Sequence, residues 1–322
     1  QGVEKLTIWQ TPQGIIGRQE PRDVNFTIEA VRYDRTFRVA VAELRNRVLV
    51  PMPPQDIVRI EIDPGQGQGE RIQLRRAAGD AMRMFWPVDV DTDAAAVNDL
   101  LVATERLRVV DFVDGEPGEL GRFGLDRGFL TVSLHPRLHE TAATVLHFGR
   151  DEGEHTYVKR DDEPFVAKVE RSAVDVLRRS WQNYATRSAA TNLPSDAATI
   201  RYRVQGEERA VLTRDQGTWR NAGGADVTDQ AADLLEILAG LRGRRVFDGQ
   251  DPAVANELAA ARQVEIEVRG ASGASATLVL HDRGKEGGER RQAWVVHRRV
   301  PRIVIELGPS DTTALLAPLG ER

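Results

Sequence analysis

The stretch Ile57-Val-Arg-Ile-Glu-Ile62 alternates apolar and polar residues, which is the period-two pattern of a strand with one buried face. Arg71-Ile-Gln-Leu74 follows across a glycine-rich run at 65–69 and predicts the second strand of a hairpin. Further along, apolar residues recur from Val97 to Leu107 at the spacing of an amphipathic helix. Two strands and a helix therefore begin an α+β unit.

The same order of segments recurs in the second half of the chain. Thr199-Ile-Arg-Tyr-Arg-Val204 is similar to the first strand, and a second leucine-rich helix follows it. Matched residues of the two halves are separated by a nearly constant 133 or 134 residues: Trp86 and Trp219, Leu100 and Leu234, His147 and His281. An ordered series at one spacing predicts a tandem duplication.

Each copy continues with short β-like runs and ends in a short helix. The predicted strands are Thr131–Leu134, Thr144–Phe148, Thr156–Lys159 and Phe165–Val169 in the first copy, and Val264–Val268, Ala276–His281, Ala293–His297 and Ile303–Leu307 in the second. Consecutive strands joined by short polar turns pair as antiparallel meanders. The predicted fold class is α+β, with two tandem copies of an antiparallel sheet, helices packed on one face of each, and an N-terminal strand element.

These patterns divide the chain into three predicted segments. They are an N-terminal β element at residues 1–50, a first α+β repeat at 51–187 and a second at 188–322. In the N-terminal element, Phe26 to Tyr33 and Thr36 to Ala42 predict a hairpin. The two repeats are expected to bury matching residues: Trp86, Leu100, Leu101, Trp219, Leu234 and Leu235.

The composition excludes several classes of protein. The 322 residues carry a formal net charge of −5, so there is no chain-wide basic field and nucleic acid is not expected as a partner. The chain contains no cysteine, which excludes a thiol nucleophile and a cysteine-ligated metal site. Because the sequence starts at Gln1 without a methionine, we expect an N-terminal signal or membrane anchor ahead of it.

The histidines are the first candidates for chemistry. His135, His139 and Glu140 are the nearest approach to a metal constellation, but Pro136 disfavours the helix that would bring both imidazoles together. His147 and His281 are each expected to end a strand and to pack there. We therefore assign no catalytic, cofactor-binding or metal-binding residue.

Arginines gather around Trp294 near the C-terminal end. Arginines interleaved with an aromatic residue can stack on single-stranded nucleic acid, but acidic residues balance the chain and Trp294 corresponds to Tyr157 in a predicted core strand. We predict instead either a salt-bridged face or a contact with an anionic protein or lipid. The residues of the predicted partner-binding surface are Arg290, Arg291, Arg298, Arg299 and Arg302.

The first copy also contains an ordered series of short motifs: Trp86-Pro-Val-Asp-Val, Leu100-Leu101, Phe123-Gly-Leu-Asp126, Thr131-Val-Ser-Leu134, Leu146-His-Phe-Gly149, Tyr157-Val158 and Val166 to Val169. As an ordered set it resembles the bacterial family catalogued as domain of unknown function 4340. The likeness covers about residues 57–187 and rests on the repeat for 198–316. The second copy departs from it, because Leu258-Ala259 replaces Gly-Leu-Asp and no glycine follows His281.

The resemblance implies a membrane-anchored, extracytoplasmic protein that accompanies ABC-type transport components of the gliding-motility kind, in a family without assigned catalytic residues. We therefore expect a non-catalytic scaffold or binding subunit on the periplasmic face of the inner membrane, with protein subunits of that complex as partners and no cofactor. One alternative is a protein that binds an extracellular polymer such as a glycan or peptidoglycan. Another is a metal-dependent hydrolase that uses His135, His139 and Glu140.

Overall fold

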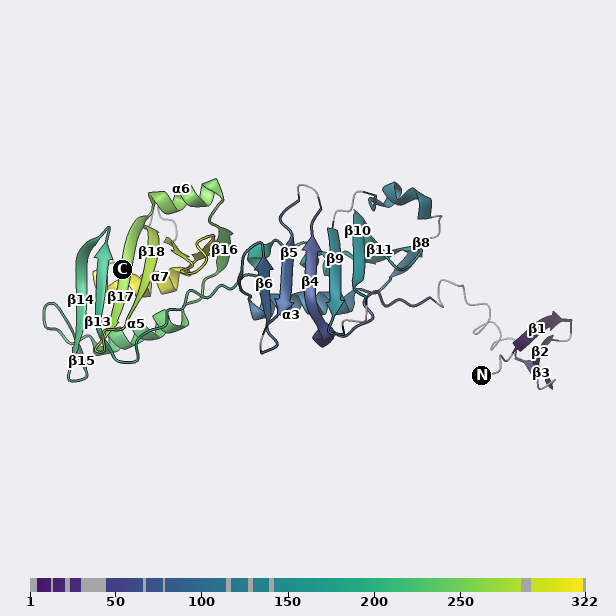
Figure 1. The fold of residues 1–322 in the computed structure, drawn as a ribbon, viewed down its shortest axis with the longest axis horizontal. Coiled ribbons are helices and arrows are strands. Elements are labelled where there is room, and N and C mark those ends of the chain that lie inside the picture. Colours follow the sequence, from purple (N-terminus) through teal and green to yellow (C-terminus); the bar gives the residue numbers. More distant parts are fainter. Residues whose placement is uncertain are drawn as a thin grey trace.

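The computed structural model describes residues 5–12, 14–20, 24–29, 45–65, 68–77, 79–113, 117–126, 130–138, 142–284 and 291–320. These residues form three sheets, and helices accompany the two larger ones (Figure 1). Every strand pairing described within the sheets is antiparallel: Ile57–Asp63 with Leu130–Pro136 is one example, and Ala197–Val204 with Arg262–Gly270 is another. The protein therefore has an α+β fold, as the sequence predicts. Among the described residues, no helix has the length and apolar character needed to span a bilayer.

The N-terminal sheet has three strands in sequence order. They are β1 (Lys5–Thr11), β2 (Gly14–Glu20) and β3 (Val24–Ile28). The predicted hairpin of Phe26 to Tyr33 with Thr36 to Ala42 lies almost wholly outside the described residues, apart from its first residues in β3. Trp9 and Phe26 expose their side chains on this small sheet, which has too little area to bury both of its faces.

The first large sheet, called the first sheet below, has the strand order β7-β6-β5-β4-β9-β10-β11-β12-β8. Its strands are β4 (Ile57–Asp63), β5 (Ile72–Arg76), β6 (Met82–Trp86), β7 (Val90–Asp91), β8 (Asp111–Val113), β9 (Leu130–Pro136), β10 (Thr144–Glu152), β11 (His155–Arg160) and β12 (Val166–Glu170). Its helical segments are η1 (Pro54–Asp56), α3 (Ala94–Arg106), η2 (Pro117–Phe123), α4 (Arg171–Leu177) and η3 (Trp181–Asn183).

The second large sheet, called the second sheet below, has the strand order β15-β14-β13-β17-β18-β19-β20-β16. Its strands are β13 (Ala197–Val204), β14 (Glu207–Asp215), β15 (Thr218–Asn221), β16 (Arg245–Asp248), β17 (Arg262–Gly270), β18 (Ser275–Gly284), β19 (Gln292–Val296) and β20 (Ile303–Glu306). Its helical segments are α5 (Thr228–Gly240), α6 (Pro252–Ala260), α7 (Pro309–Leu316) and η4 (Ala317–Leu319).

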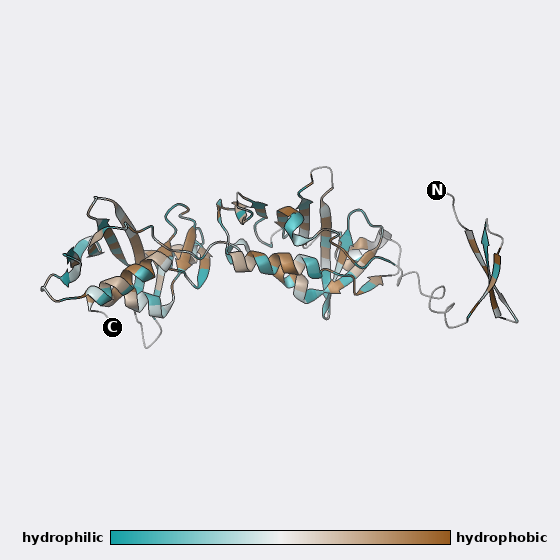
Figure 2. Ribbon diagram, turned by 90° about the horizontal axis from the view of Figure 1, so that it is seen from below, coloured by the Kyte–Doolittle hydropathy of each residue, from teal (hydrophilic) through white to brown (hydrophobic). Residues whose placement is uncertain are grey.

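Both large sheets follow the same path through their strands. From β6 to β8 the first sheet has the order of β15 to β16 in the second, with α3 and α5 at one equivalent point and α4 and α7 at another. Val97 and Leu100 on α3 are buried, as are Ala231 and Leu234 on α5. Each helix packs this apolar stripe on its sheet and leaves the other side polar, and Figure 2 accordingly shows both kinds of residue along the helices.

The predicted core residues differ in how far they are buried. Leu100, Trp219 and Leu234 are buried, and the side chains of Leu101 and Leu235 are partly buried against the same core. The prediction for Trp86 is wrong, because 56% of this residue is exposed. A bulge in the β5–β6 pairing moves Trp86 out of the alternation, since Leu74 pairs with Met84 but Gln73 pairs with Trp86.

The strand register gives a different set of equivalent residues in the two sheets from the one that sequence spacing predicts. Leu74 and Leu212 hold the same place, because each pairs with a buried isoleucine of the neighbouring strand. Two residues further along, Arg76 pairs with Met82 and Arg214 pairs with Trp219. Met82, not Trp86, is therefore the counterpart of Trp219.

A connecting segment at residues 184–191 hydrogen-bonds to both units. On one side, the amide of Asp93 donates to the carbonyl oxygen of Tyr184 at 2.9 Å. On the other, the amide of Ala189 donates to the carbonyl oxygen of Leu241 at 2.9 Å, and that of Thr191 to Leu238 at 3.0 Å. The predicted boundary between residues 187 and 188 falls within this segment, and its backbone is paired on both sides.

The side chain of Asp93 reinforces this joint. One carboxylate oxygen caps α3 by accepting from the amides of Ala95 and Ala96. The other oxygen accepts from Nε of Arg187 at 2.8 Å and from Nη2 of Arg242 at 2.5 Å. Because Arg242 belongs to the second unit, one buried carboxylate holds a helix of the first unit, the connecting segment and the second unit together.

Candidate functional site

The predicted arginine surface is divided in the structure. Arg291 is buried and donates to Asp282 from Nε at 2.9 Å and from Nη2 at 2.8 Å. Arg298 and Arg299 are exposed, and Arg290 lies outside the described residues. The expectation of one continuous partner-binding surface is wrong for Arg291, because its guanidinium neutralises a buried carboxylate of β18.

Arg302 is also held within the protein. Its Nη2 lies 2.6 Å from Oδ2 of Asp248, and the same nitrogen pairs with Glu70 of the first unit. Its guanidinium carbon lies 5.3 Å from the ring centre of Trp181. The hydrogen bond to Asp248 raises the pKa of Arg302, although partial burial acts against it. Arg302 therefore contributes to the contact between the two units, not to an open surface.

Of the three residues of the predicted metal constellation, only His135 lies among the described residues. His139 and Glu140 lie outside the described residues, and His135 pairs in β9 with Arg59 of β4. Burial, assisted by the adjacent Arg59 guanidinium, lowers the pKa of His135. Within the described ranges, no group of three acidic or imidazole side chains is placed to hold a metal ion.

His147 and His281 are not counterparts. His147 pairs with Thr131 across β9 and β10, and the matching position across β17 and β18 is Val279. His147 hydrogen-bonds through its ring to Asp161 at 2.6 Å and to Thr131 at 3.1 Å. The predicted equivalence of His147 and His281 is wrong by two residues along the strand. Because side chains alternate between the two faces of a sheet, a shift of two residues leaves both rings on the same face.

The exposed aromatic residues of the first sheet were not predicted. Phe85 and Trp86 expose 40% and 56% of their surface near the edge of the sheet, and Trp86 precedes Pro87 through a cis peptide bond. The guanidinium of Arg75 lies 5.3 Å from the ring centre of Phe85. Large aromatic side chains left in solvent at one place are typical of an interaction surface. We call Phe85 and Trp86 the β6 aromatic pair.

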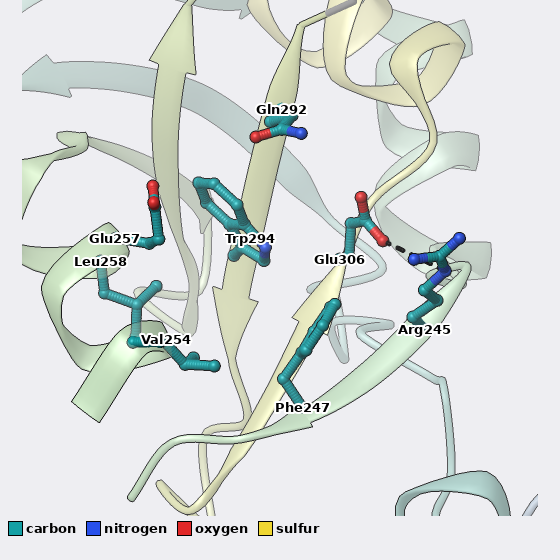
Figure 3. A pocket seen from close by; sticks show the side chains of 9 residues that line it. Arg245, Phe247, Val254, Glu257, Leu258, Gln292, Trp294 and Glu306 are labelled. Carbon is teal, nitrogen blue, oxygen red and sulfur yellow. Dashed lines mark ion pairs between the residues drawn. The ribbon is translucent and has the colours of Figure 1, made fainter. Parts of the chain in front are cut away.

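A pocket of about 230 Å³ opens in the second unit between α6 and the strands β16, β19 and β20 (Figure 3). Its walls contain the apolar side chains of Phe247, Val254, Leu258 and Trp294, and its charged side chains include Arg245 and Glu306. We call this the α6 pocket. Helix α6 was missed in the sequence, although Asp251-Pro252 is a start signal: the Asp251 carboxylate accepts from the Ala253 amide at 2.9 Å.

A model described as "Domain of unknown function (DUF4340)" matches residues 83–260, more than half of the chain. The chain belongs to the DUF4340 family. No curated protein and no solved structure shows significant similarity to it.

The DUF4340 match runs from β6 of the first sheet to the end of α6 in the second unit. It therefore includes the β6 aromatic pair, the joint around Asp93 and the helix that forms one wall of the α6 pocket. The family region spans parts of both units and is not confined to one of them.

Within the DUF4340 region, the place that corresponds to the α6 pocket is closed in the first unit. Phe123, the last residue of η2, packs on Tyr157 with ring centres 4.9 Å apart, and Leu125 and Val166 belong to the same cluster. Tyr157 and Trp294 occupy equivalent positions in their strands. The residue after Tyr157, Val158, pairs with Phe148, and the residue after Trp294, Val295, pairs with the equivalent Leu280. The site is therefore filled by aromatic side chains in the first unit, and the equivalent site in the second unit is the open α6 pocket.

The residues beneath the facing segments also differ between these two sites. Phe148 and Leu280 are equivalent, so the following residues, Gly149 and His281, are also equivalent. A Cβ on Gly149 would lie 2.2 Å from the carbonyl oxygen of Phe123, so only glycine allows this close approach. At the equivalent place, the ring of His281 contacts the carbonyl oxygen of Leu258 at 3.3 Å. The imidazole holds α6 away from the sheet where glycine lets the first-unit loop come close.

Proposed function

We propose that this protein is a non-catalytic binding subunit that serves as a scaffold for an ABC-type membrane transport complex of the gliding-motility kind, on the extracytoplasmic side of the inner membrane. Membership of the DUF4340 family supports this proposal, because the resemblance that identified the family implies such partners. The strand order that the two large sheets share, from β6 to β8 and from β15 to β16, supports an origin by duplication of one α+β unit.

The exposure of Trp86 is the single observation that carries the proposal of a protein partner. An exposed tryptophan keeps a large apolar area in water, and tryptophan is enriched among the residues that dominate protein–protein binding energies. Trp86 lies beside Phe85, so the β6 aromatic pair offers a compact apolar contact with charged residues near it. A partner that covers both rings would remove this area from solvent.

The joint between the units supports the scaffold part of the proposal. Asp93 connects α3, the connecting segment and Arg242, while Arg302 connects Asp248 with Glu70. Several ion pairs and backbone hydrogen bonds that cross between units oppose their independent motion. A frame of this kind holds a partner on one unit at a fixed orientation to the other.

The test is a pull-down from native membranes with the tagged protein, followed by identification of the captured subunits by mass spectrometry. Wild-type protein is expected to recover permease or ATPase subunits of a transporter, and Trp86→Ala is expected to lose them. Leu138→Ala is the matched control, because Leu138 is also an exposed apolar residue of the first unit. Failure of the wild type to recover any transporter subunit contradicts the proposal.

Polymer binding is the second candidate, because an exposed tryptophan also stacks on sugar rings. Co-sedimentation with insoluble peptidoglycan separates the two candidates. Retention of the wild type and loss of retention in Trp86→Ala, with no transporter subunit captured, would replace the scaffold proposal with this one.

A further inference from the structure

We propose that the α6 pocket binds an ammonium or guanidinium group carried on a short aliphatic stem. This site is distinct from the β6 aromatic pair, since it lies in the second unit, and it does not depend on the scaffold function. Figure 3 shows its parts: Trp294 and Phe247 frame the pocket, Val254 and Leu258 face them from α6, and Glu306 lies toward Arg245.

The carboxylate of Glu306 provides the first part of the argument. Its Oε2 is buried and accepts no hydrogen bond from the described residues. Nε of Arg245 lies 3.9 Å away, beyond hydrogen-bond distance, and 69% of the Arg245 side chain is exposed. A buried carboxylate oxygen without a donor is unfavourable. Because 17% of the Glu306 side chain is exposed, an incoming cation would meet the carboxylate group there and compensate its charge.

The apolar walls provide the second part. The indole of Trp294 is the most favourable side-chain ring for a cation, and Trp294 is the cross-strand neighbour of Glu306. An ammonium or guanidinium at this place would meet a ring face and a carboxylate together. Phe247, Val254 and Leu258 line the rest of the pocket, which suits the methylene groups of a stem.

The first unit contains the same arrangement with its own cation. Lys168 pairs across strands with Tyr157, as Glu306 does with Trp294. The ammonium of Lys168 lies 5.2 Å from the ring centre of Tyr157 and forms an ion pair with Glu152. The first unit thus supplies a cation to its ring, whereas the second unit has a carboxylate at the position of that cation.

The residues paired with Lys168 and Glu306 on the next strand, β8 or β16, also have opposite charges in the two sheets. Lys168 pairs with Asp111 in the first sheet, and Glu306 pairs with Arg245 in the second. The volume of about 230 Å³ lies below the range of roughly 300–1,000 Å³ that is usual for larger ligands. The pocket therefore suits a group the size of one side chain. A lysine or arginine side chain of a polypeptide and a free small amine share this chemistry.

The experiment is a titration of the whole chain followed by two-dimensional amide NMR. The probes are n-butylammonium chloride, Nα-acetyl-lysine methylamide and Nα-acetyl-arginine methylamide, and n-butanol is the uncharged control. Dissociation constants on the order of millimolar are expected for ligands of this size, with shifts at the amides of β19, β20 and α6. No shift with n-butanol is expected at the same concentration.

Two variants with matched controls test the roles of the charges. Glu306→Gln should weaken binding about tenfold or more, because it removes a charge-assisted hydrogen bond. Glu265→Gln, which changes a carboxylate of the same sheet outside the pocket lining, should leave binding unchanged. Arg245→Gln should strengthen binding a few-fold by removing a competing cation from Glu306, and the neighbouring exposed Arg244→Gln should not.

Each outcome decides the proposal. Equal binding of n-butanol, no effect of Glu306→Gln in a folded variant, or weaker binding by Arg245→Gln would each overturn it. If Glu306→Gln fails to fold, Arg245→Gln alone gives the decision. Tighter binding of the two blocked amino acids than of n-butylammonium supports a polypeptide source for the cation, and the reverse order supports a free amine. The NMR titration does not depend on whether the pull-down captures transporter subunits. A failure of the scaffold proposal can therefore be distinguished from a failure of the pocket proposal.

Discussion

A Cβ added to Gly149 of β10 would lie 2.2 Å from the carbonyl oxygen of Phe123, which places the backbone at the end of η2 directly on the first sheet. At the equivalent position of the second sheet, His281 holds the backbone of Leu258 at the distance of a hydrogen bond. The close approach of the Phe123 backbone to β10 therefore requires glycine at this position, whereas the second sheet has a side chain between β18 and α6.

Gly149→Ala is expected to destabilise the protein by about 1–3 kcal/mol, because the methyl group forces the Phe123 backbone away from the sheet. Urea unfolding monitored by circular dichroism measures the difference. Gly240→Ala is the matched control, since no atom lies within 4 Å of a Cβ there. We expect this control to be neutral or slightly stabilising, and an equal loss in both variants would contradict the steric explanation.

The two tryptophans that the sequence aligns should behave differently. Trp219 is 4% exposed, so Trp219→Ala is expected to cost about 3–5 kcal/mol of unfolding free energy through the cavity that it creates. Trp86→Ala removes an exposed side chain and is expected to change stability by less than about 0.5 kcal/mol. Thermal and urea unfolding of the two variants side by side provide the measurement. Similar losses for both would mean that Trp86 is packed after all.

The alternation of apolar residues was sufficient to locate several strands of the two large sheets, whereas β1 and β2 of the N-terminal sheet were not predicted. Ile57 to Ile62 lies in β4 and Thr131 to Leu134 lies in β9, because burial of one sheet face imposes period two on the sequence. The match of Trp86 with Trp219 was wrong because a bulge shifts the register of β6, and this bulge cannot be recognised from the amino-acid composition. For His147 and His281 the cause is the turn before the strand: Leu134 pairs with Thr144 but Val268 pairs with Ala276, so the connection is two residues shorter in the second sheet.

The α6 pocket could not be predicted in the same way. Its walls come from two stretches that are far apart in the sequence, 245–258 and 292–306, so their proximity arises only from the strand order of the sheet. The arginine cluster was misread for a related reason. Sequence shows that Arg291 and Arg302 are near one another along the chain, but not that Asp282 and Asp248 neutralise them.

The joint between the two units should weaken when Asp93 loses its charge. Asp93→Asn keeps an oxygen that caps α3 but removes the ion pairs with Arg187 and Arg242, so a loss of about 1–3 kcal/mol is expected. Hydrogen exchange should also show faster opening of the Ala189 and Thr191 amides, which bond to the second unit. Asp233→Asn, at an exposed carboxylate of α5, controls for the loss of one negative charge.

The same carboxylate predicts how the joint responds to pH. Burial alone would raise the pKa of Asp93, but the hydrogen bonds from Arg187 and the Ala96 amide, with the charges of Arg187 and Arg242, outweigh it and lower the pKa. A folded-state pKa below the unfolded value of about 4 means that the carboxylate stabilises the fold fully above that value and loses this effect as pH falls through the folded pKa. The difference in unfolding free energy between wild type and Asp93→Asn should therefore be constant from about pH 5 to pH 7 and shrink below about pH 4. Urea unfolding of both proteins across this range checks the sign, and a difference that grows as the solution becomes more acidic would exclude a stabilising carboxylate at the joint.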